Sequence, residues 1–178
     1  TGSMQVRPWQ DGIPDWQFEL DGKNGVLEGS EFGAPPLVIE SWVANGKIVP
    51  RRGLVEIAEF HLKGGGGEAT AKAIIQAGPS GESTSAELSL SPMPLDTLKA
   101  LWPKALAPGA REWVGESVSA ASFKGGALQY ANGDFLKGEL PPSGVKSERL
   151  SANFEVSDAT FVPLPGMSPI TAPRGLIQ

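Results

Sequence analysis

The residue best suited to acid–base chemistry in this chain is His61, the only histidine among its 178 residues. A hydrolase triad needs a histidine together with a nucleophile and an orienting carboxylate. His61 lies instead in an alternating segment, two residues after Glu59, so both side chains point to the same side of a strand. We therefore interpret His61 as a residue on the surface of a sheet. The chain has no cysteine, which excludes disulfides, thiolate metal sites and thiol nucleophiles.

Glycines and carboxylates suggest two further kinds of chemistry. Glycines 64–67 have the glycine content of a phosphate-binding loop, but the Lys-Ser or Lys-Thr of a P-loop does not follow them, so they predict a turn. A carboxylate pair could serve a glycosidase, yet Glu40, Glu56 and Glu59 sit in strands, where solvated carboxylates are common. The sequence predicts no catalytic residue, no metal site and no cofactor, and we do not expect an enzyme.

Charge and composition limit the partners. The net charge is −5, and Arg51-Arg52 is the only adjacent basic pair. An acidic chain has no long-range attraction for nucleic acid, which we exclude as a partner, or for anionic lipid headgroups. No apolar run approaches the roughly 20 residues of a membrane helix.

Most of the chain alternates between apolar and polar residues. The 23 glycines and 16 prolines suit many short strands joined by turns. Alternation predicts strands within residues 16–91 and 119–178. In residues 54–62 it predicts Leu54, Glu56, Ala58, Phe60 and Leu62 on one face and Val55, Ile57, Glu59 and His61 on the other. The fold class is mainly β: a curved antiparallel sheet, either an open groove or taco-like.

Glycine-containing dipeptides predict where the strands turn. Asp21-Gly22 and Asn24-Gly25 are expected turns, and Asn45-Gly46 and Asn132-Gly133 are expected hairpins. Residues 78–81, Gly-Pro-Ser-Gly, are a further expected turn.

The pattern becomes helical at about residues 94–117. Apolar residues recur there at helical spacing, with Pro94 and Pro108 near the starts of two short segments. Such short amphipathic helices are not stable alone in water. We expect this insert to dock on the sheet through one apolar face, formed by Leu98, Leu101, Trp102, Trp113 and Val114.

One apolar face stands out as a candidate lining for an acyl chain. Residues 150–157 alternate most regularly, and their apolar side is joined by that of residues 86–90. The expected lining residues are Leu150, Ala152, Phe154, Val156, Leu88 and Leu90. Trp16 and Trp42 are expected in the core or in the groove lining. The pattern leaves open whether this face forms an open groove or a sealed core.

The expected organisation is one β-rich domain over residues 16–178. Residues 1–15 are interpreted as a tag remnant, suggested by Thr1-Gly2-Ser3-Met4, followed by a polar lead-in. The chain is expected to be a fragment of a longer protein.

Two motifs resemble the YhdP-like branch of the AsmA-like superfamily. The first is Leu-Trp-Pro at 101–103, followed by Ala-Pro-Gly-Ala-Arg at 107–111 and Trp-Val at 113–114; the second is the segment 161–170, where Phe161 stands for the family's aromatic residue and Ser168 departs from its usual proline. Together they cover at most about a quarter of the chain.

This resemblance implies a Gram-negative envelope protein: a long bent β-sheet with a hydrophobic inner groove. It implies a periplasmic location, an inner-membrane anchor in the full-length protein, and a role in phospholipid transport and outer-membrane integrity. The expected partner is a phospholipid or another acyl-chain lipid, with other envelope proteins possible at the sheet edges. An envelope scaffold or protein-interaction module without lipid conduction remains the alternative, and a carbohydrate-active enzyme or carbohydrate-binding module is a third.

Overall fold

The structure is a computed structural model that describes residues 2–7, 15–27, 36–78, 81–102, 108–133, 148–164 and 166–177. Its elements run in the order β1 (Gly2–Arg7), β2 (Asp15–Leu27), β3 (Leu37–Val49), η1 (Pro50–Arg52), β4 (Leu54–Gly64), β5 (Gly67–Gly78), β6 (Gly81–Leu90), β7 (Met93–Pro94), α1 (Leu95–Leu101), α2 (Pro108–Ser117), β8 (Val118–Asn132), β9 (Glu148–Phe161) and β10 (Ile170–Ile177).

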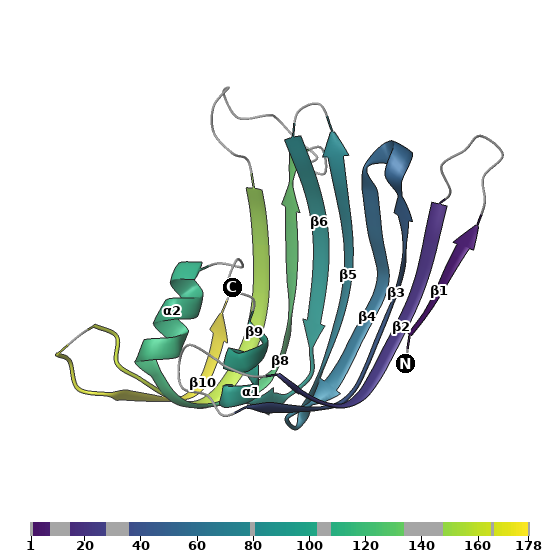
Figure 1. Cartoon of the computed structure of the whole chain (residues 1–178). Coiled ribbons are helices and arrows are strands. Elements are labelled where there is room, and N and C mark those ends of the chain that lie inside the picture. The colour runs from purple at the N-terminus through teal and green to yellow at the C-terminus, as the bar shows by residue number, and fades with distance from the viewer. Residues whose placement is uncertain are drawn as a thin grey trace, which may run out of the picture.

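The strands form one open antiparallel sheet in the order β1-β2-β3-β4-β5-β6-β8-β9-β10, and the two-residue β7 pairs with β8. Each strand of this path pairs with its neighbour along the chain, apart from the β7 and helical insertion between β6 and β8 (Figure 1). Within the described residues β1 and β10 are the two edges, and they do not pair with each other. The predicted fold class is confirmed, including the helical insert, and the sheet is open.

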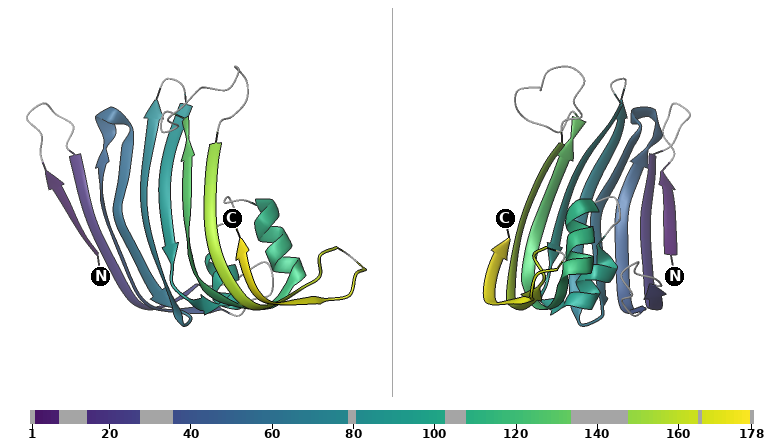
Figure 2. Two further views of the ribbon diagram at one scale, coloured as in Figure 1. Left: turned by 180° about the vertical axis from the view of Figure 1, so that it is seen from behind. Right: turned by 90° about the vertical axis from the view of Figure 1, so that its left-hand side faces the viewer.

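The sheet is strongly bent along its strands. Figures 1 and 2 show that the strands rise side by side and curve at one end, where α1 and α2 lie inside the bend. Register shifts occur near Glu40 in β3, at residues 58–59 in β4 and between Phe123 and Gly125 in β8. A bulge adds one residue to one strand and bends it, so these shifts account for part of the curvature.

Several turn dipeptides lie inside strands, so those turn predictions were wrong. Gly22 and Gly25 lie within β2, and Gly46 lies within β3. A Cβ on Gly22 would overlap the Trp42 indole, and one on Gly46 would overlap a backbone carbonyl of β4. Glycine is needed at both positions because another group approaches the backbone closely.

Other boundaries agree with the sequence. Gly65 and Gly66 have positive φ values of 58° and 79° in the β4–β5 turn, where glycine has no steric cost. Gly78 pairs with Gly81 across the β5–β6 turn. The strand β8 ends at Asn132, and Gly133 has a φ of 58°.

The first residues differ from the expectation. Residues 1–15 were expected to be a lead-in outside the β domain. Gly2–Arg7 instead form β1, which pairs with β2 from Gly2↔Leu20 to Arg7↔Asp15.

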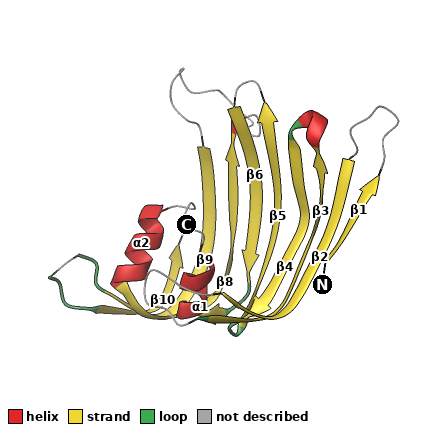
Figure 3. Ribbon diagram, viewed as in Figure 1, coloured by secondary structure: helices red, strands yellow, loops and turns green. Residues whose placement is uncertain are grey.

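The buried core is small and lies at the bent end of the sheet. Phe123 (2% exposed), Met93 and Leu95 are buried there together with Leu37 and Ile39 at the start of β3. Figure 3 shows both α-helices at this end; among the described residues the rest of the strand length carries no α-helix on either face, and the single turn η1 lies at the opposite end. The helical insert therefore covers only part of the sheet.

Candidate functional site

The register brings the six expected lining residues onto one face. Directly opposed residues in an antiparallel pair share a face. Leu88 opposes Leu128, which opposes Ala152; Leu90 opposes Gly126, which opposes Phe154. By alternation, Leu150 and Val156 lie on the same side as Ala152 and Phe154. Phe154 packs against Trp102, so this is the face that carries the helices, on the inside of the bend.

This face is apolar across the sheet, far beyond the six expected residues. Following the register from β9 to β2 adds Trp16 and Trp42, which were expected in the core or in the groove lining, and further residues that sequence reasoning did not assign to the lining. We call the part beyond the helices the apolar wall: Trp16, Phe18, Leu20, Trp42, Ala44, Ile48, Val55, Ile57, Phe60, Leu62, Ala71, Ala73, Ile75, Ala86, Leu88, Tyr130, Leu150 and Ala152.

A bulge in β4 keeps the wall apolar. Ile57 opposes Ala73, and Phe60 opposes Ala71, so Ala58 and Glu59 together face the single residue Lys72. Ile57 and Phe60 therefore share the apolar side. The expectation that Phe60 and Ile57 lie on opposite faces was wrong because strict alternation does not continue through a bulge.

The apolar wall has no protein layer over it within the described residues. Leu128, between Leu88 and Ala152 in one cross-strand row of this face, is 5% exposed, whereas none of the side chains assigned to the wall is buried and Leu150 is 44% exposed. No described side chain anywhere is less than 2% exposed. The total accessible surface is 11480 Å², against about 8,200 Å² expected for a compact monomer of this mass. The wall is therefore an exposed apolar surface rather than half of a sealed core.

The helices dock on the sheet through aromatic contacts. The Trp102 ring lies 6.5 Å from Phe154, which lies 5.6 Å from Phe123. Trp113 of α2 lies 6.0 Å from Phe161 but remains 41% exposed. The other expected docking residues, Leu98, Leu101 and Val114, are half-buried.

Two cations join the helices to each other. Lys99 of α1 donates to the carbonyls of Gly115 and Val118, at 3.1 and 2.9 Å. Arg111 of α2 is 9% exposed, and its Nε donates to the carbonyl of Trp102 at 3.2 Å. Each helix thus supplies a cation to the C-terminal carbonyls of the other, which complements both helix dipoles. Sequence reasoning missed this arrangement, although Lys99 in the last turn of α1 was a visible signal.

Thr97 anchors α1 to the sheet. It is 5% exposed, and its hydroxyl donates to the carbonyl of Gly65 at 2.6 Å. The helical insert is therefore tied to the β4–β5 turn as well as to β8 and β9.

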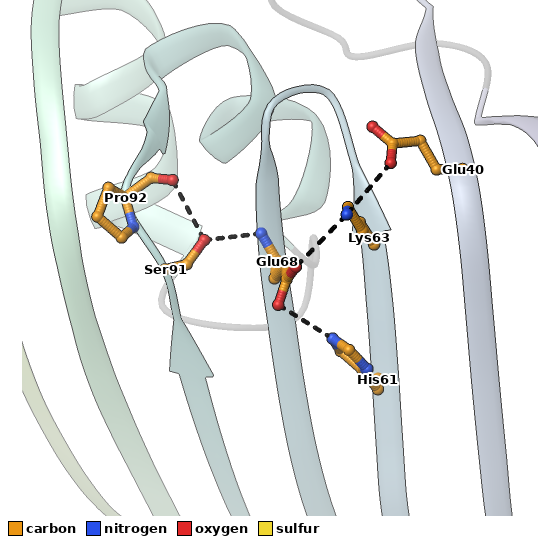
Figure 4. A network of polar contacts seen from close by, with 6 residues as sticks. All are labelled: Glu40, His61, Lys63, Glu68, Ser91 and Pro92. Carbon is orange, nitrogen blue, oxygen red and sulfur yellow. Dashed lines mark hydrogen bonds and ion pairs between the residues drawn. The ribbon is translucent and has the colours of Figure 1, made fainter.

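The opposite face of the sheet is mainly polar. Figure 4 shows Lys63 between Glu40 and Glu68, at 3.7 and 3.9 Å, and His61 3.4 Å from Glu68. These side chains are 40–55% exposed, so each pair contributes about 0–1 kcal/mol. His61 lies on the sheet surface, as expected. An exposed Val26–Val38 pair, each residue 60% exposed, is an apolar exception on this face.

No cluster of three or more metal-ligating side chains occurs among the described residues. In the same part of the chain, no helix has the length and apolarity needed to cross a bilayer. The feature that the fold does build is the apolar wall, and such a surface binds apolar groups through their removal from water. Comparisons of the chain with protein-family models, with curated proteins and with solved structures found no match to any of them.

Proposed function

We propose that this protein forms part of a hydrophobic β-groove that holds the acyl chains of phospholipids. The observation that carries the proposal is the apolar wall, which extends from β2 to β9 without a covering layer among the described residues. Contiguous apolar surfaces of this kind mark binding sites in soluble proteins.

Three properties support a lipid rather than a small polar substrate. The wall is continuous over neighbouring strands and therefore suits a long apolar chain better than a compact one. Its described side chains are almost entirely hydrocarbon. Passive binding of a chain needs no catalytic group, which agrees with the expectation that the protein is not an enzyme.

The proposed setting follows the resemblance in the two sequence motifs. A periplasmic protein of the AsmA-like kind, anchored in the inner membrane, would use such a groove to carry phospholipid and to maintain the outer membrane. In this setting the chain is one segment of a longer groove.

The test compares two adjacent residues of β9 that face opposite sides. Leu150 is on the apolar wall and Ser151 is on the polar face, and both are exposed. The purified protein is incubated with phospholipid vesicles and separated from them, and the bound lipid is extracted and quantified by mass spectrometry. We expect bound lipid in the wild type, a several-fold loss for Leu150→Asp, and little change for Ser151→Asp.

The substitutions place a carboxylate at adjacent positions, so charge and strand propensity are matched. The absence of lipid from the wild-type protein, or an equal loss in both variants, contradicts the proposal.

A second candidate function is a scaffold that binds proteins by strand addition. It is favoured by the sheet edges β1 and β10, each of which has a single neighbouring strand among the described residues. An edge strand is a template for pairing with another chain. A protein that carries no lipid but changes its mass in solution with a partner strand supports this candidate instead.

A further inference from the structure

We infer that the acyl chain lies parallel to the strands, with its headgroup at the free end of the wall and its methyl end against Trp102. This inference rests on the proposed function and adds two features to it: the orientation of the lipid, and a residue that limits the length of the chain.

The free end of the wall is polar. We call it the rim, and it includes Arg51 and Arg52 in η1 and Glu82 in β6, which shares the face of Ala86 and Leu88. All three side chains are exposed. Both signs of charge occur there, so the rim offers polar contacts to a headgroup without selecting one sign. Figure 1 shows these strand ends at the top, away from both helices.

The other end of the wall is closed by the helical insert. The Trp102 ring packs on Phe154, and Phe154 lies in one cross-strand row with Gly126, Leu90 and Ala69. Past this row toward the bend, Phe123 is 2% exposed and Met93 is 4% exposed. Apolar side chains of the protein already cover one another there, so an acyl chain has no free surface beyond Trp102.

The distance between the two ends suits one acyl chain. From this row to the rim, β5 advances from Ala69 to Ala77 and β6 from Leu90 to Glu82, which is eight steps of about 3.4 Å, or about 27 Å, in each strand. One leaflet of a bilayer core is about 15 Å thick, half of a core of roughly 30 Å. A chain stretched along a strand is longer than the disordered chains of a leaflet, and together with its glycerol group it extends from Trp102 to the rim.

The polarity gradient sets the direction of the chain. A headgroup placed at the helical end would lie next to Phe123 and Phe154. It would lose its hydrogen bonds to water there and gain no polar partner in exchange, which is costly. The methyl end placed at the rim would lie among charged side chains and water. Only the orientation with the headgroup at the rim satisfies both ends of the lipid.

The test uses the wild-type protein and two photoreactive phosphatidylcholines. One carries a diazirine at the methyl end of an acyl chain, and the other carries it in the headgroup. After irradiation the protein is digested, and the crosslinked peptides are identified by mass spectrometry. We expect the methyl-end probe on peptides that contain Trp102 or Phe154, and the headgroup probe on peptides that contain Arg51 or Glu82.

The two hypotheses fail differently in this experiment. A reversed pattern, or the same peptides for both probes, overturns the orientation but leaves lipid binding intact. The absence of crosslinks above a control without irradiation counts against the proposed function itself.

A second measurement tests Trp102 as the residue that limits chain length. Purified protein is offered an equimolar mixture of phosphatidylcholines with progressively longer saturated chains, and the bound species are compared with the input. We expect Trp102→Ala to enrich the longer species at least twofold relative to the wild type. Trp113→Ala is the matched control, because Trp113 packs on Phe161 rather than at the boundary of the wall. An unchanged profile in a folded Trp102→Ala variant, or the same shift in both variants, overturns this role.

Discussion

Two phenylalanines on the same face test whether the apolar wall is a free surface or part of the core. Phe123 is 2% exposed and packs 5.6 Å from Phe154 under the helices. Its replacement by alanine should cost about 3–5 kcal/mol of unfolding free energy, as for a large side chain removed from a packed core.

Phe60 on the wall should behave differently. Its side chain is half-buried, and its direct cross-strand neighbours are the small residues Ala44 and Ala71. Complete burial of a phenylalanine contributes about 1.5–3 kcal/mol, so half of it corresponds to about 1 kcal/mol. Phe60→Ala is therefore expected to cost about 2–4 kcal/mol less than Phe123→Ala, and the loss of strand propensity is the same in both.

Urea unfolding followed by tryptophan fluorescence measures both costs. The midpoint should shift strongly for Phe123→Ala and weakly for Phe60→Ala, with the dependence on urea unchanged. Equal costs would refute the reasoning, because the wall would then be packed as tightly as the region under the helices. With lipid present, Phe60→Ala should also reduce the amount of lipid bound, whereas a folded Phe123→Ala should retain it.

Four further substitutions test contacts in the helical insert and in the sheet. Lys99→Met removes two hydrogen bonds to carbonyls at the α2–β8 junction and should cost about 2 kcal/mol in urea unfolding, with faster amide exchange at the end of α2; a cost near zero would show that Lys99 does not hold the helices. Gly46→Ala places a Cβ against a backbone carbonyl of β4 and should cost about 1–3 kcal/mol, whereas Gly109→Ala, with no atom within 4 Å of the new Cβ, should be neutral or stabilising by up to about 1 kcal/mol; equal thermal unfolding of the two variants contradicts the close approach at Gly46. Lys47→Met breaks a 2.6 Å ion pair with Glu56 whose side chains are 42% and 30% exposed, and it should change stability by less than about 1 kcal/mol, with the difference shrinking in high salt.

Alternation in the sequence predicted most of the sheet, because the face on which a strand residue lies follows from its position relative to its near neighbours in the chain. In β9, Leu150, Ala152, Phe154 and Val156 share the face that the pattern indicates. The helical insert was recognisable for a similar reason, since its apolar residues recur at helical spacing and its prolines lie near helix starts. These features depend on near neighbours in the chain.

The features that sequence reasoning missed depend on distant neighbours. Gly22 lies under Trp42, and Gly46 lies under a β4 carbonyl; a glycine that permits a close approach has the same sequence signature as a glycine that permits a turn. Lys99 and Arg111 each donate to a carbonyl at the end of the other helix, so both helices must be in place before either hydrogen bond can form. The open state of the sheet could not be predicted either, because an apolar strand face looks the same beneath a second layer and in a groove.

The bulge in β4 explains how this strand presents only apolar side chains to the wall. In a regular strand one extra residue moves every later side chain to the other face. Without the bulge, the two residues Ala58 and Glu59 between Ile57 and Phe60 would place either Ile57 and Val55 or Phe60 and Leu62 on the polar face. The bulge places Ala58 and Glu59 together opposite Lys72 and keeps all four apolar side chains on one face. The same strand therefore bends and remains one-sided, which are the two properties that a curved surface for an apolar chain requires.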